Sequence, residues 1–269
     1  MKNLIMLSFL TLTVNAFALT PQKNYENSVK AVLILDYEKC DGTPKQATGF
    51  FIGSEGVILT NYHVVRNTNL KTMIGKSIKD TIYSNFEILS VDPDSDIAVL
   101  KVSGIQEKES YLELVSSEKK YLIGDEVNWI GHPIGAENFT FSNGYISQLS
   151  TKGNVETIQF NGVGYHGNSG SPILNSDGEV IGILHGGTDG FKKLQEEVGN
   201  VMLGSGRENI NQALQMAKNI IPVAQICRTS ITESKSTLSN INESKNDLAS
   251  LIRELKAYTP PEERKLGSL

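Results

Sequence analysis

Short apolar runs, each bounded by glycine or by turn-forming residues, follow one another through the first two-thirds of the chain. They are too short and too evenly spaced for strands that alternate with helices, so they predict an all-β fold. The runs are VKAVLILDY, TGFFIG, GVILTNYHVV, FEILSVD, DIAVLKV, EVNWIGH, NGYISQL, VETIQF, GSPILN and EVIGILHG.

Two of these stretches are alike. GFFIGSEGVILT at 49–60 and SPILNSDGEVIGIL at 171–184 each contain a strand, a turn with an acidic residue and glycine, and a second apolar strand. The likeness predicts two related β-barrels, the first over about 28–105 and the second over about 121–205. Residues 104–120 are polar and weakly patterned, and they are the expected linker between the barrels.

Helical signals begin after the second predicted barrel. Ser205 and Glu208 have the spacing of a capping box. This pattern predicts a helix over 206–221 that stops at Pro222. The helix would complete a domain that begins at residue 19 and ends at 222.

Residues 223–269 are expected to form an amphipathic helical extension and a frayed tail. Apolar residues recur at steps of three and four, which predicts a helix from about 230 to 256. The stripe consists of Ile231, Leu238, Ile241, Leu248, Ile252 and Leu255. It either packs on the barrels or forms a coiled-coil arm that binds a partner or a second copy of the chain. The small number of heptads favours packing on the barrels.

The first 18 residues have the features of a signal peptide that is cleaved on export. Lys2 precedes an apolar run, and AFA at 16–18 fits the small-x-small site of a signal peptidase. A membrane-spanning helix needs roughly 20 apolar residues, and threonines and Asn15 interrupt this run early. We therefore expect export without a stable membrane anchor.

Length, charge and cysteine content narrow the classes of protein. The 269 residues suffice for one large or two small hydrophobic cores. The formal net charge of −5 argues against nucleic acid or anionic lipid as a partner. Cys40 and Cys227 are the two cysteines, and in an oxidising compartment they would form one disulfide. The alternative is two reduced thiols.

The chemistry expected of the chain is nucleophilic catalysis. The sequence has four histidines but none of the spacings typical of zinc or calcium sites, so no metal or other cofactor is expected. A serine hydroxyl becomes a useful nucleophile when a neutral imidazole takes its proton. The imidazole in turn needs a carboxylate that fixes its tautomer. The sequence must therefore supply all three groups.

One candidate for each group stands in a suitable place. YHGNSGSPIL at 165–174 sets Ser169 among glycines in a segment unlike a helix. His63 ends the predicted strand GVILTNYHVV, and Asp96 directly precedes an apolar strand. Gly167 lets the N–H groups of Gly167 and Ser169 turn inward together towards a developing oxyanion. Taken singly, His63 could be a rim histidine, Asp96 a helix or turn cap, and Ser169 a turn serine.

Three motifs carry a resemblance to a known family. TNYHVV, DIAVLKV and GNSGSP, in this order, resemble the chymotrypsin-fold serine proteases, in particular the bacterial branch of glutamyl endopeptidases and HtrA-type proteases. GHPIG, NGYIS and GEVIGILHGG also resemble strands of that family's second barrel. The match covers about residues 28 to 221. It implies two six-stranded Greek-key β-barrels with C-terminal helices, in a bacterial protein of the periplasm or the cell exterior.

The resemblance also implies a role for each candidate. Ser169 would attack the peptide carbonyl, His63 would act as general base and then acid, and Asp96 would orient His63. Gly167 and Ser169 would form the oxyanion hole. The residues implied at the substrate pocket are Val163, Gly164, Tyr165, His166, Ile183, Leu184, His185 and Gly186.

Two departures from the family limit what carries over. Glutamyl endopeptidases hold the substrate carboxylate with a histidine that here would stand at Leu184, whereas the histidine is His185. Because one step along a strand turns a side chain to the opposite face, Glu specificity does not carry over, and small or medium apolar residues are preferred to acidic ones. HtrA-type proteases usually carry a PDZ domain, for which the roughly 45 residues after Pro222 are too few.

The sequence thus predicts an exported serine endopeptidase that acts on polypeptides. The alternative is a catalytically inactive barrel module that binds a partner through its C-terminal helix.

Overall fold

The computed structural model describes residues 19–53, 55–105, 109–162, 166–185 and 201–218. All of them belong to one unit of the chain, Met1–Ile226. The predicted signal peptide, the helical extension and Cys227 lie outside the described residues. None of the described helices has the length and apolar character needed to traverse a bilayer.

A short helix that the strand pattern does not predict precedes the first strand. Helix α1 (Pro21–Ser28) has Thr20 as its N-cap, and proline stands at its first position, where no intrahelical N–H is lost. A 3₁₀ turn, η1 (Val29–Ala31), follows. The Nδ2 of Asn24 donates to the carbonyl of Asn175 at 3.0 Å, which ties α1 to a turn in the second half of the fold.

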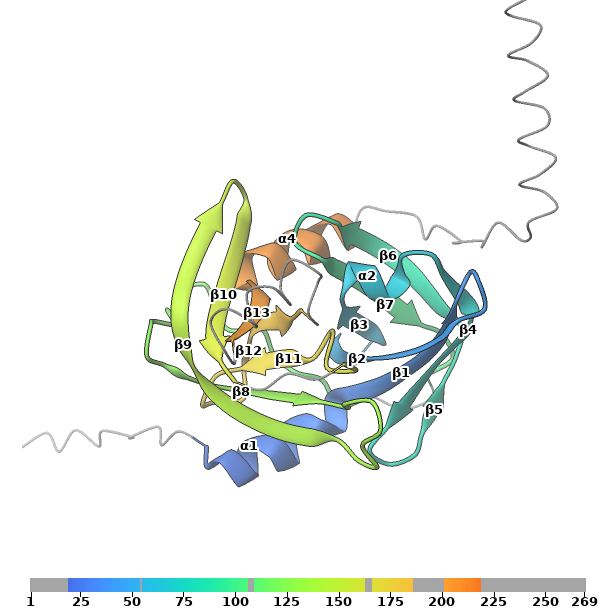
Figure 1. Cartoon of the computed structure of the whole chain (residues 1–269), viewed down its shortest axis with the longest axis horizontal. Helices are drawn as coiled ribbons and strands as arrows, with labels where there is room; N and C mark the ends of the chain where they lie inside the picture. Colours follow the sequence, from blue (N-terminus) through green and yellow to red (C-terminus); the bar gives the residue numbers. More distant parts are fainter. Residues whose placement is uncertain (1–18, 54, 106–108, 163–165, 186–200, 219–269) are drawn as a thin grey trace, which may run out of the picture. The chain divides into compact units, whose positions relative to one another are not determined.

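The first half of the described fold is an antiparallel sheet of seven strands in the order β5-β4-β1-β2-β3-β7-β6 (Figure 1). Its strands are β1 (Val32–Lys39), β2 (Pro44–Gly53), β3 (Val57–Thr60), β4 (Thr68–Ser77), β5 (Ile82–Tyr83), β6 (Phe86–Asp92) and β7 (Ile97–Val102). The sheet differs from the expected six-stranded barrel in having an extra strand and an open ladder. The short β5 pairs with β4. A turn at Asn85, where φ is +62°, then leads the chain to β6 at the other edge of the sheet.

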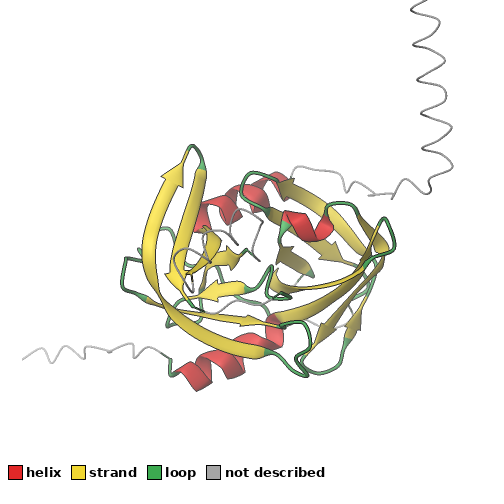
Figure 2. Ribbon diagram, in the orientation of Figure 1, coloured by secondary structure: helices red, strands yellow, loops and turns green. Residues whose placement is uncertain are grey.

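The second half is a closed barrel of six described strands in the order β10-β13-β12-β11-β8-β9. Its strands are β8 (Glu126–Gly131), β9 (Thr140–Lys152), β10 (Val155–Asn161), β11 (Pro172–Leu174), β12 (Val180–Leu184) and β13 (Val201–Gly206). Strands predominate throughout the described chain (Figure 2). The expected all-β class and the six-stranded second barrel are confirmed.

Helix α4 (Arg207–Ala217) follows the barrel, but the predicted capping box is wrong. The N-cap is Gly206, without a side-chain cap, because Ser205 belongs to β13 and its hydroxyl is used elsewhere. Ile210 and Ala213 are buried against the first half of the fold. The hydroxyl of Ser90 in β6 donates to the Ala213 carbonyl at 2.7 Å and fixes the helix there.

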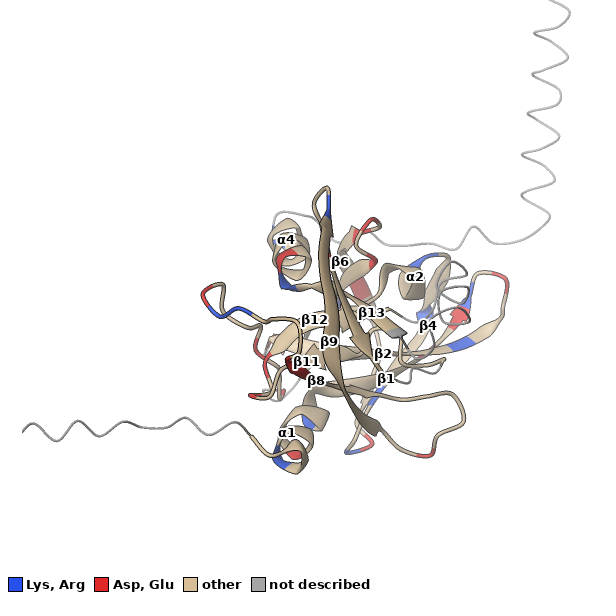
Figure 3. Ribbon diagram, turned by 60° about the vertical axis from the view of Figure 1, so that its left-hand side comes forward, with Lys and Arg blue, Asp and Glu red and all other residues tan. Residues whose placement is uncertain are grey.

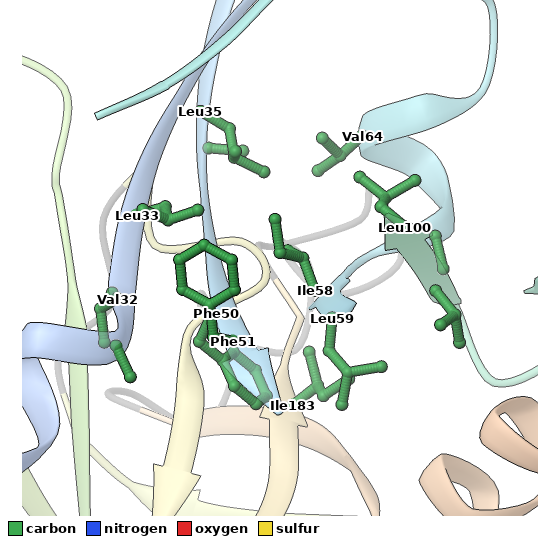
Figure 4. Close-up of a cluster of buried hydrophobic side chains, with 14 of the residues drawn as sticks. Val32, Leu33, Leu35, Phe50, Phe51, Ile58, Leu59, Val64, Leu100 and Ile183 are labelled. Carbon is green, nitrogen blue, oxygen red and sulfur yellow. The ribbon is translucent and has the colours of Figure 1, made fainter. Parts of the chain in front are cut away.

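The main hydrophobic core crosses the seam between the two halves. Phe50 and Phe51 of β2 and Leu59 of β3 are fully buried in it, as their apolar side chains require. Ile183 of β12 packs into the same cluster (Figure 4). The two halves therefore share a core, which gives the chain segments on either side of the seam fixed positions.

Candidate active site

His63 lies on a single helical turn and not at the end of a strand. Strand β3 ends at Thr60, Asn61 is extended, and helix α2 (Tyr62–Val65) begins at the next residue. The N–H of Tyr62 donates to the carbonyl of Asp96 at 3.1 Å, in the register of the β3–β7 pair, and the chain turns helical from that residue. The sequence prediction of a longer strand is therefore wrong at this point.

Asp96 holds the turn that carries His63. One carboxylate oxygen accepts the His63 N–H at 2.8 Å, and the other lies 2.7 Å from Nδ1 of the ring. The Asp96 carbonyl also accepts from Nδ2 of Asn61 at 3.0 Å. Asp96 has φ +52°, a left-handed conformation that costs about 1–3 kcal/mol outside glycine. These hydrogen bonds keep it in that conformation.

The contact fixes the tautomer of neutral His63. An ionised carboxylate only accepts hydrogen bonds, so Nδ1 carries the ring proton and Nε2 is the free base. The two side chains are 39% and 17% exposed, respectively. Burial raises the pKa of Asp96, but the hydrogen bonds and charge of His63 and the charge of His185 outweigh it and lower the pKa below its ordinary value.

The lowered pKa predicts a pH-dependent contribution to stability. Because the folded-state pKa of Asp96 lies below the unfolded value, its stabilisation is present above the unfolded pKa and is lost as pH falls through the folded pKa. The difference in unfolding free energy between the wild type and Asp96→Asn should therefore shrink between about pH 6 and about pH 3. Urea unfolding at both pH values measures it. A difference that stays constant contradicts the prediction.

Ser169 lies in a half-buried loop that the first sheet holds in place. The Thr48 N–H of β2 donates to the carbonyl of Ser169 at 2.8 Å, and the Thr48 hydroxyl donates to that of Gly167 at 2.8 Å. The Thr60 hydroxyl in turn donates to the Thr48 carbonyl at 2.8 Å. Since Thr60 lies two residues before helix α2, which carries His63, the serine loop and that turn share one support.

The glycine at 167 is required by the loop backbone. Gly167 has φ +101°, and a Cβ there would lie 2.2 Å from the His132 carbonyl oxygen. The carbonyl of His166 accepts from Ile134 N at 2.7 Å on the same side. The described residues contain no hydrogen bond between the Ser169 hydroxyl and His63, a contact that often tightens only when substrate binds.

Lys39 supports the His63 turn from the other side. Its ammonium donates to the carbonyls of His63 at 2.9 Å, Val64 at 3.2 Å and Arg66 at 2.8 Å. It also donates to the Thr68 hydroxyl at 3.2 Å. A cation suits this position because helix carbonyls at a C-terminal end carry partial negative charge. Lys39 therefore caps the turn.

Lys39→Met is expected to lower the unfolding free energy by roughly 1–3 kcal/mol, because the carbonyls of His63 and Arg66 lose a charged donor. The peptide hydrolysis that the sequence analysis predicts should fall by about tenfold in kcat as His63 loses its fixed position. Thermal unfolding and peptide hydrolysis measure the two effects. The control is Lys45→Met, which removes an exposed lysine of β2. Equal behaviour of the two variants contradicts a capping role.

The structure describes part of the predicted pocket. Val163, Gly164, Tyr165 and Gly186 lie outside the described residues, and His166 is exposed. Ile183 and Leu184 have fully buried side chains, so any contact with substrate falls to their backbone. His185 follows β12, and its Nε2 lies 2.8 Å from the hydroxyl of Ser205.

Cys40 is disulfide-bonded. Its predicted partner Cys227 lies outside the described residues, so the pairing of these two cysteines stays a prediction. The backbone N–H of Cys40 donates to the Asn67 carbonyl at 2.8 Å, just after the His63 turn. This hydrogen bond places Cys40 beside the segment that follows the His63 turn.

The described part of the chain offers neither a metal site nor a surface of one charge. No cluster of three or more histidine, cysteine, aspartate or glutamate side chains there could hold a metal ion. In the view of Figure 3, charged residues of both signs lie mainly on loops, turns and helices. His132 is buried, with Nδ1 2.9 Å from Oε1 of Gln46 and its ring edge-on to Phe139.

Sequence reasoning missed three residues of this arrangement. Thr48 and Lys39 stand inside ordinary strand patterns, and their contacts run to segments distant in sequence, so no local signal marks them. Asn61 had a signal, because asparagine is among the residues preferred at a helix N-cap. Here its side chain does not cap the helix and binds Asp96 instead.

Comparison with known proteins identifies relatives of this chain. The trypsin-like peptidase domain matches residues 47–183, about half of the chain. A probable periplasmic serine endoprotease DegP-like of Rickettsia conorii is 32% identical over 159 residues, which cover 55% of this chain and 30% of that protein. Serine protease HTRA1 of Xenopus laevis is 33% identical over 158 residues, 56% of this chain and 33% of its own. The chain thus spans about a third of the length of these relatives.

Solved structures show the same fold. The HtrA-type protease AlgW with tripeptide aligns with a TM-score of 0.60 and 21% identity, over 73% of this chain and 62% of that chain. The serine endoprotease from Yersinia pestis aligns with a TM-score of 0.61 and 21% identity, over 74% and 67%.

Proposed function

Because the chain belongs to the trypsin-like peptidase domain family, we propose that it is an HtrA-type serine endopeptidase that hydrolyses polypeptides through a His63–Asp96–Ser169 triad. The observation that carries the proposal is the 2.7 Å contact between Nδ1 of His63 and the Asp96 carboxylate, which leaves Nε2 free as a base. The common support of the His63 turn and the serine loop by Thr48 and Thr60 adds to it.

In the proposed reaction, Ser169 Oγ bonds to the carbonyl carbon of the substrate while its proton passes to Nε2 of His63. Asp96 stabilises the imidazolium that forms. His63 then gives this proton to the leaving amine as the C–N bond breaks, which leaves an acyl ester on Ser169. A water molecule repeats the sequence, with His63 again as base, and releases the acid product.

The oxyanion hole is assigned to the backbone N–H groups of Gly167 and Ser169. The left-handed backbone at Gly167 favours this assignment, because an ordinary residue would collide with the His132 carbonyl. Two such donors stabilise the negative oxygen of the tetrahedral intermediate more than the neutral carbonyl of the substrate.

The proposed substrate is a polypeptide with a small or medium apolar residue before the cleaved bond. The side chain of His185 supports this preference over an acidic one, because its Nε2 is engaged by Ser205 and is not offered to a substrate carboxylate. Profiling cleavage on a peptide library tests it, and preferred cleavage after glutamate contradicts it.

The proposed site of action is the periplasm, with export directed by residues 1–18. Relatives named as periplasmic support this location. Recovery of the protein from a periplasmic extract, with an N-terminus at Leu19, is the expected result. Retention in the cytoplasm with Met1 in place contradicts it.

A fluorophosphonate probe tests the catalytic proposal, since it reacts with an activated serine and not with an ordinary one. We expect stoichiometric labelling of Ser169 that disappears in Ser169→Ala and in His63→Ala. The matched control is Ser171→Ala, which removes a buried hydroxyl two residues away that has no partner among the described residues. A folded wild-type protein that takes no label would overturn the proposal and favour an inactive module that binds a partner.

A further inference from the structure

His185 is connected to the backbone beside Asp96 through a second side chain. Its own N–H donates to the Leu203 carbonyl at 2.9 Å, which sets the residue against β13. Nε2 of its ring lies 2.8 Å from the hydroxyl of Ser205, a fully buried residue of β13. The Ser205 hydroxyl donates to the carbonyl of Ser95, the residue directly before Asp96.

The chemistry of these groups fixes the position of each proton. A carbonyl oxygen only accepts, so the single proton of the Ser205 hydroxyl goes to Ser95. The Ser205 oxygen must therefore accept from His185, whose proton lies on Nε2. The hydrogen bonds run in one direction, from His185 through Ser205 to the first half of the fold.

His185 is suited to remain a neutral donor. Burial is the largest influence and lowers its pKa, the charge of Asp96 opposes the change, and the charge of His63 adds to it. The carbonyl of Ser95, to which Ser205 donates, also opposes the change.

The segment that this chain of hydrogen bonds reaches needs support on both sides. The left-handed conformation of Asp96 is unfavourable for an ordinary residue. Asn61 and Tyr62 donate hydrogen bonds to the carbonyl of Asp96 itself. The Ser205 hydroxyl donates to the carbonyl of Ser95, the buried residue before Asp96. Both ends of the Asp96 backbone are thus fixed, one by each half of the fold.

We propose that His185 is a positioning residue: through Ser205 and the Ser95 carbonyl, it holds Asp96 in the orientation that binds His63. The inference rests on the proposed hydrolytic function. It assigns to the His185 ring the support of Asp96, in place of contact with the substrate.

Three variants test the assignment by steady-state hydrolysis of a peptide. His185→Leu should lower kcat by roughly ten- to hundredfold and change KM by less than about twofold, because the substrate contacts remain while Asp96 loses its alignment. His185→Gln keeps an N–H donor on a side chain of similar reach and should recover most of kcat. Ser205→Ala removes the middle of the chain of hydrogen bonds and should lower kcat by a similar factor.

The double variant His185→Leu/Ser205→Ala should be no slower than either single variant, since both break one connection. The control is Ser147→Ala, which removes an exposed hydroxyl that also donates to a strand carbonyl, that of Gln159. If His185→Leu does not fold, Ser205→Ala carries the test alone. A raised KM with unchanged kcat would overturn the inference in favour of substrate contact, and so would equal losses in the Leu and Gln variants.

A readout that needs no turnover separates this inference from the proposed function. The proton on Nδ1 of His63, held by Asp96, should give a low-field proton NMR signal in the wild-type protein. We expect His185→Leu to weaken or shift that signal, and His185→Gln to keep it. An unchanged signal in His185→Leu contradicts the inference, whereas a protein that keeps the signal but takes no fluorophosphonate label contradicts only the proposed function.

Discussion

Asp96→Asn is expected to lower kcat by about four orders of magnitude with little change in KM. In the wild-type protein, the carboxylate accepts from both the backbone N–H and Nδ1 of His63. An asparagine of the same shape has one oxygen and one NH₂ group, so it can accept only one of these hydrogen bonds. When the NH₂ group faces Nδ1, the ring proton moves to Nε2, and His63 can no longer take a proton from Ser169.

Steady-state hydrolysis of one peptide by both proteins measures this effect, and thermal unfolding shows that the variant is folded. Asp94→Asn is the matched control, because it makes the same substitution at an exposed aspartate two residues earlier. It should keep its rate within about twofold, as surface substitutions away from a site usually do. An Asp96→Asn variant that retains a tenth or more of wild-type kcat is incompatible with the proposed mechanism.

Gly170→Ala should produce the second large effect, a loss of roughly 2–5 kcal/mol in unfolding free energy together with loss of hydrolysis. Gly170 has φ +86°, and a Cβ there would lie 2.1 Å from the Thr48 carbonyl oxygen and 2.5 Å from the Thr60 hydroxyl oxygen. Neither backbone nor a hydroxyl already engaged in a hydrogen bond can move aside cheaply. The added methyl group therefore displaces the serine loop from its support.

A second glycine separates the collision from the backbone strain. Gly135 has φ +87°, nearly the same conformation, and a Cβ there would meet no atom within 4 Å. Gly135→Ala should therefore cost only the strain of about 1–2 kcal/mol. Chemical unfolding and peptide hydrolysis of the two variants give the comparison. Equal losses of stability at both positions would mean that the close packing of Gly170 on Thr48 does not contribute to the unfolding free energy.

The sequence predicts the regular parts of the fold well. Strands β7 and β12 come from continuous apolar runs, and the structure buries both almost completely. Local pattern fails where long-range contacts decide the backbone. After Thr60, the N–H groups of Tyr62 and His63 donate to Asp96. The chain forms a helical turn there, where the apolar run suggested a longer strand. Ser205 has the spacing of a helix cap, but its hydroxyl serves Ser95 across the seam.

The sequence predicts less of the candidate site than of the fold. The sequence singles out His63 and Asp96, and the structure places them in contact. It does not indicate the left-handed backbone of Asp96, because that conformation depends on hydrogen bonds from residues more than thirty positions away. The support given by Lys39 and Thr48 is equally invisible, since a lysine or threonine in a strand carries no mark of the segment it will bind.

The dependence of the serine loop on Thr48 has a consequence for the nascent polypeptide. Thr48 belongs to the amino-terminal sheet, yet it holds two carbonyls of a loop that is synthesised more than a hundred residues later. Neither half alone contains all the parts of the proposed hydrolytic centre, so reactivity should arise only after the halves dock. A partly folded chain would then stay unreactive until folding is nearly complete.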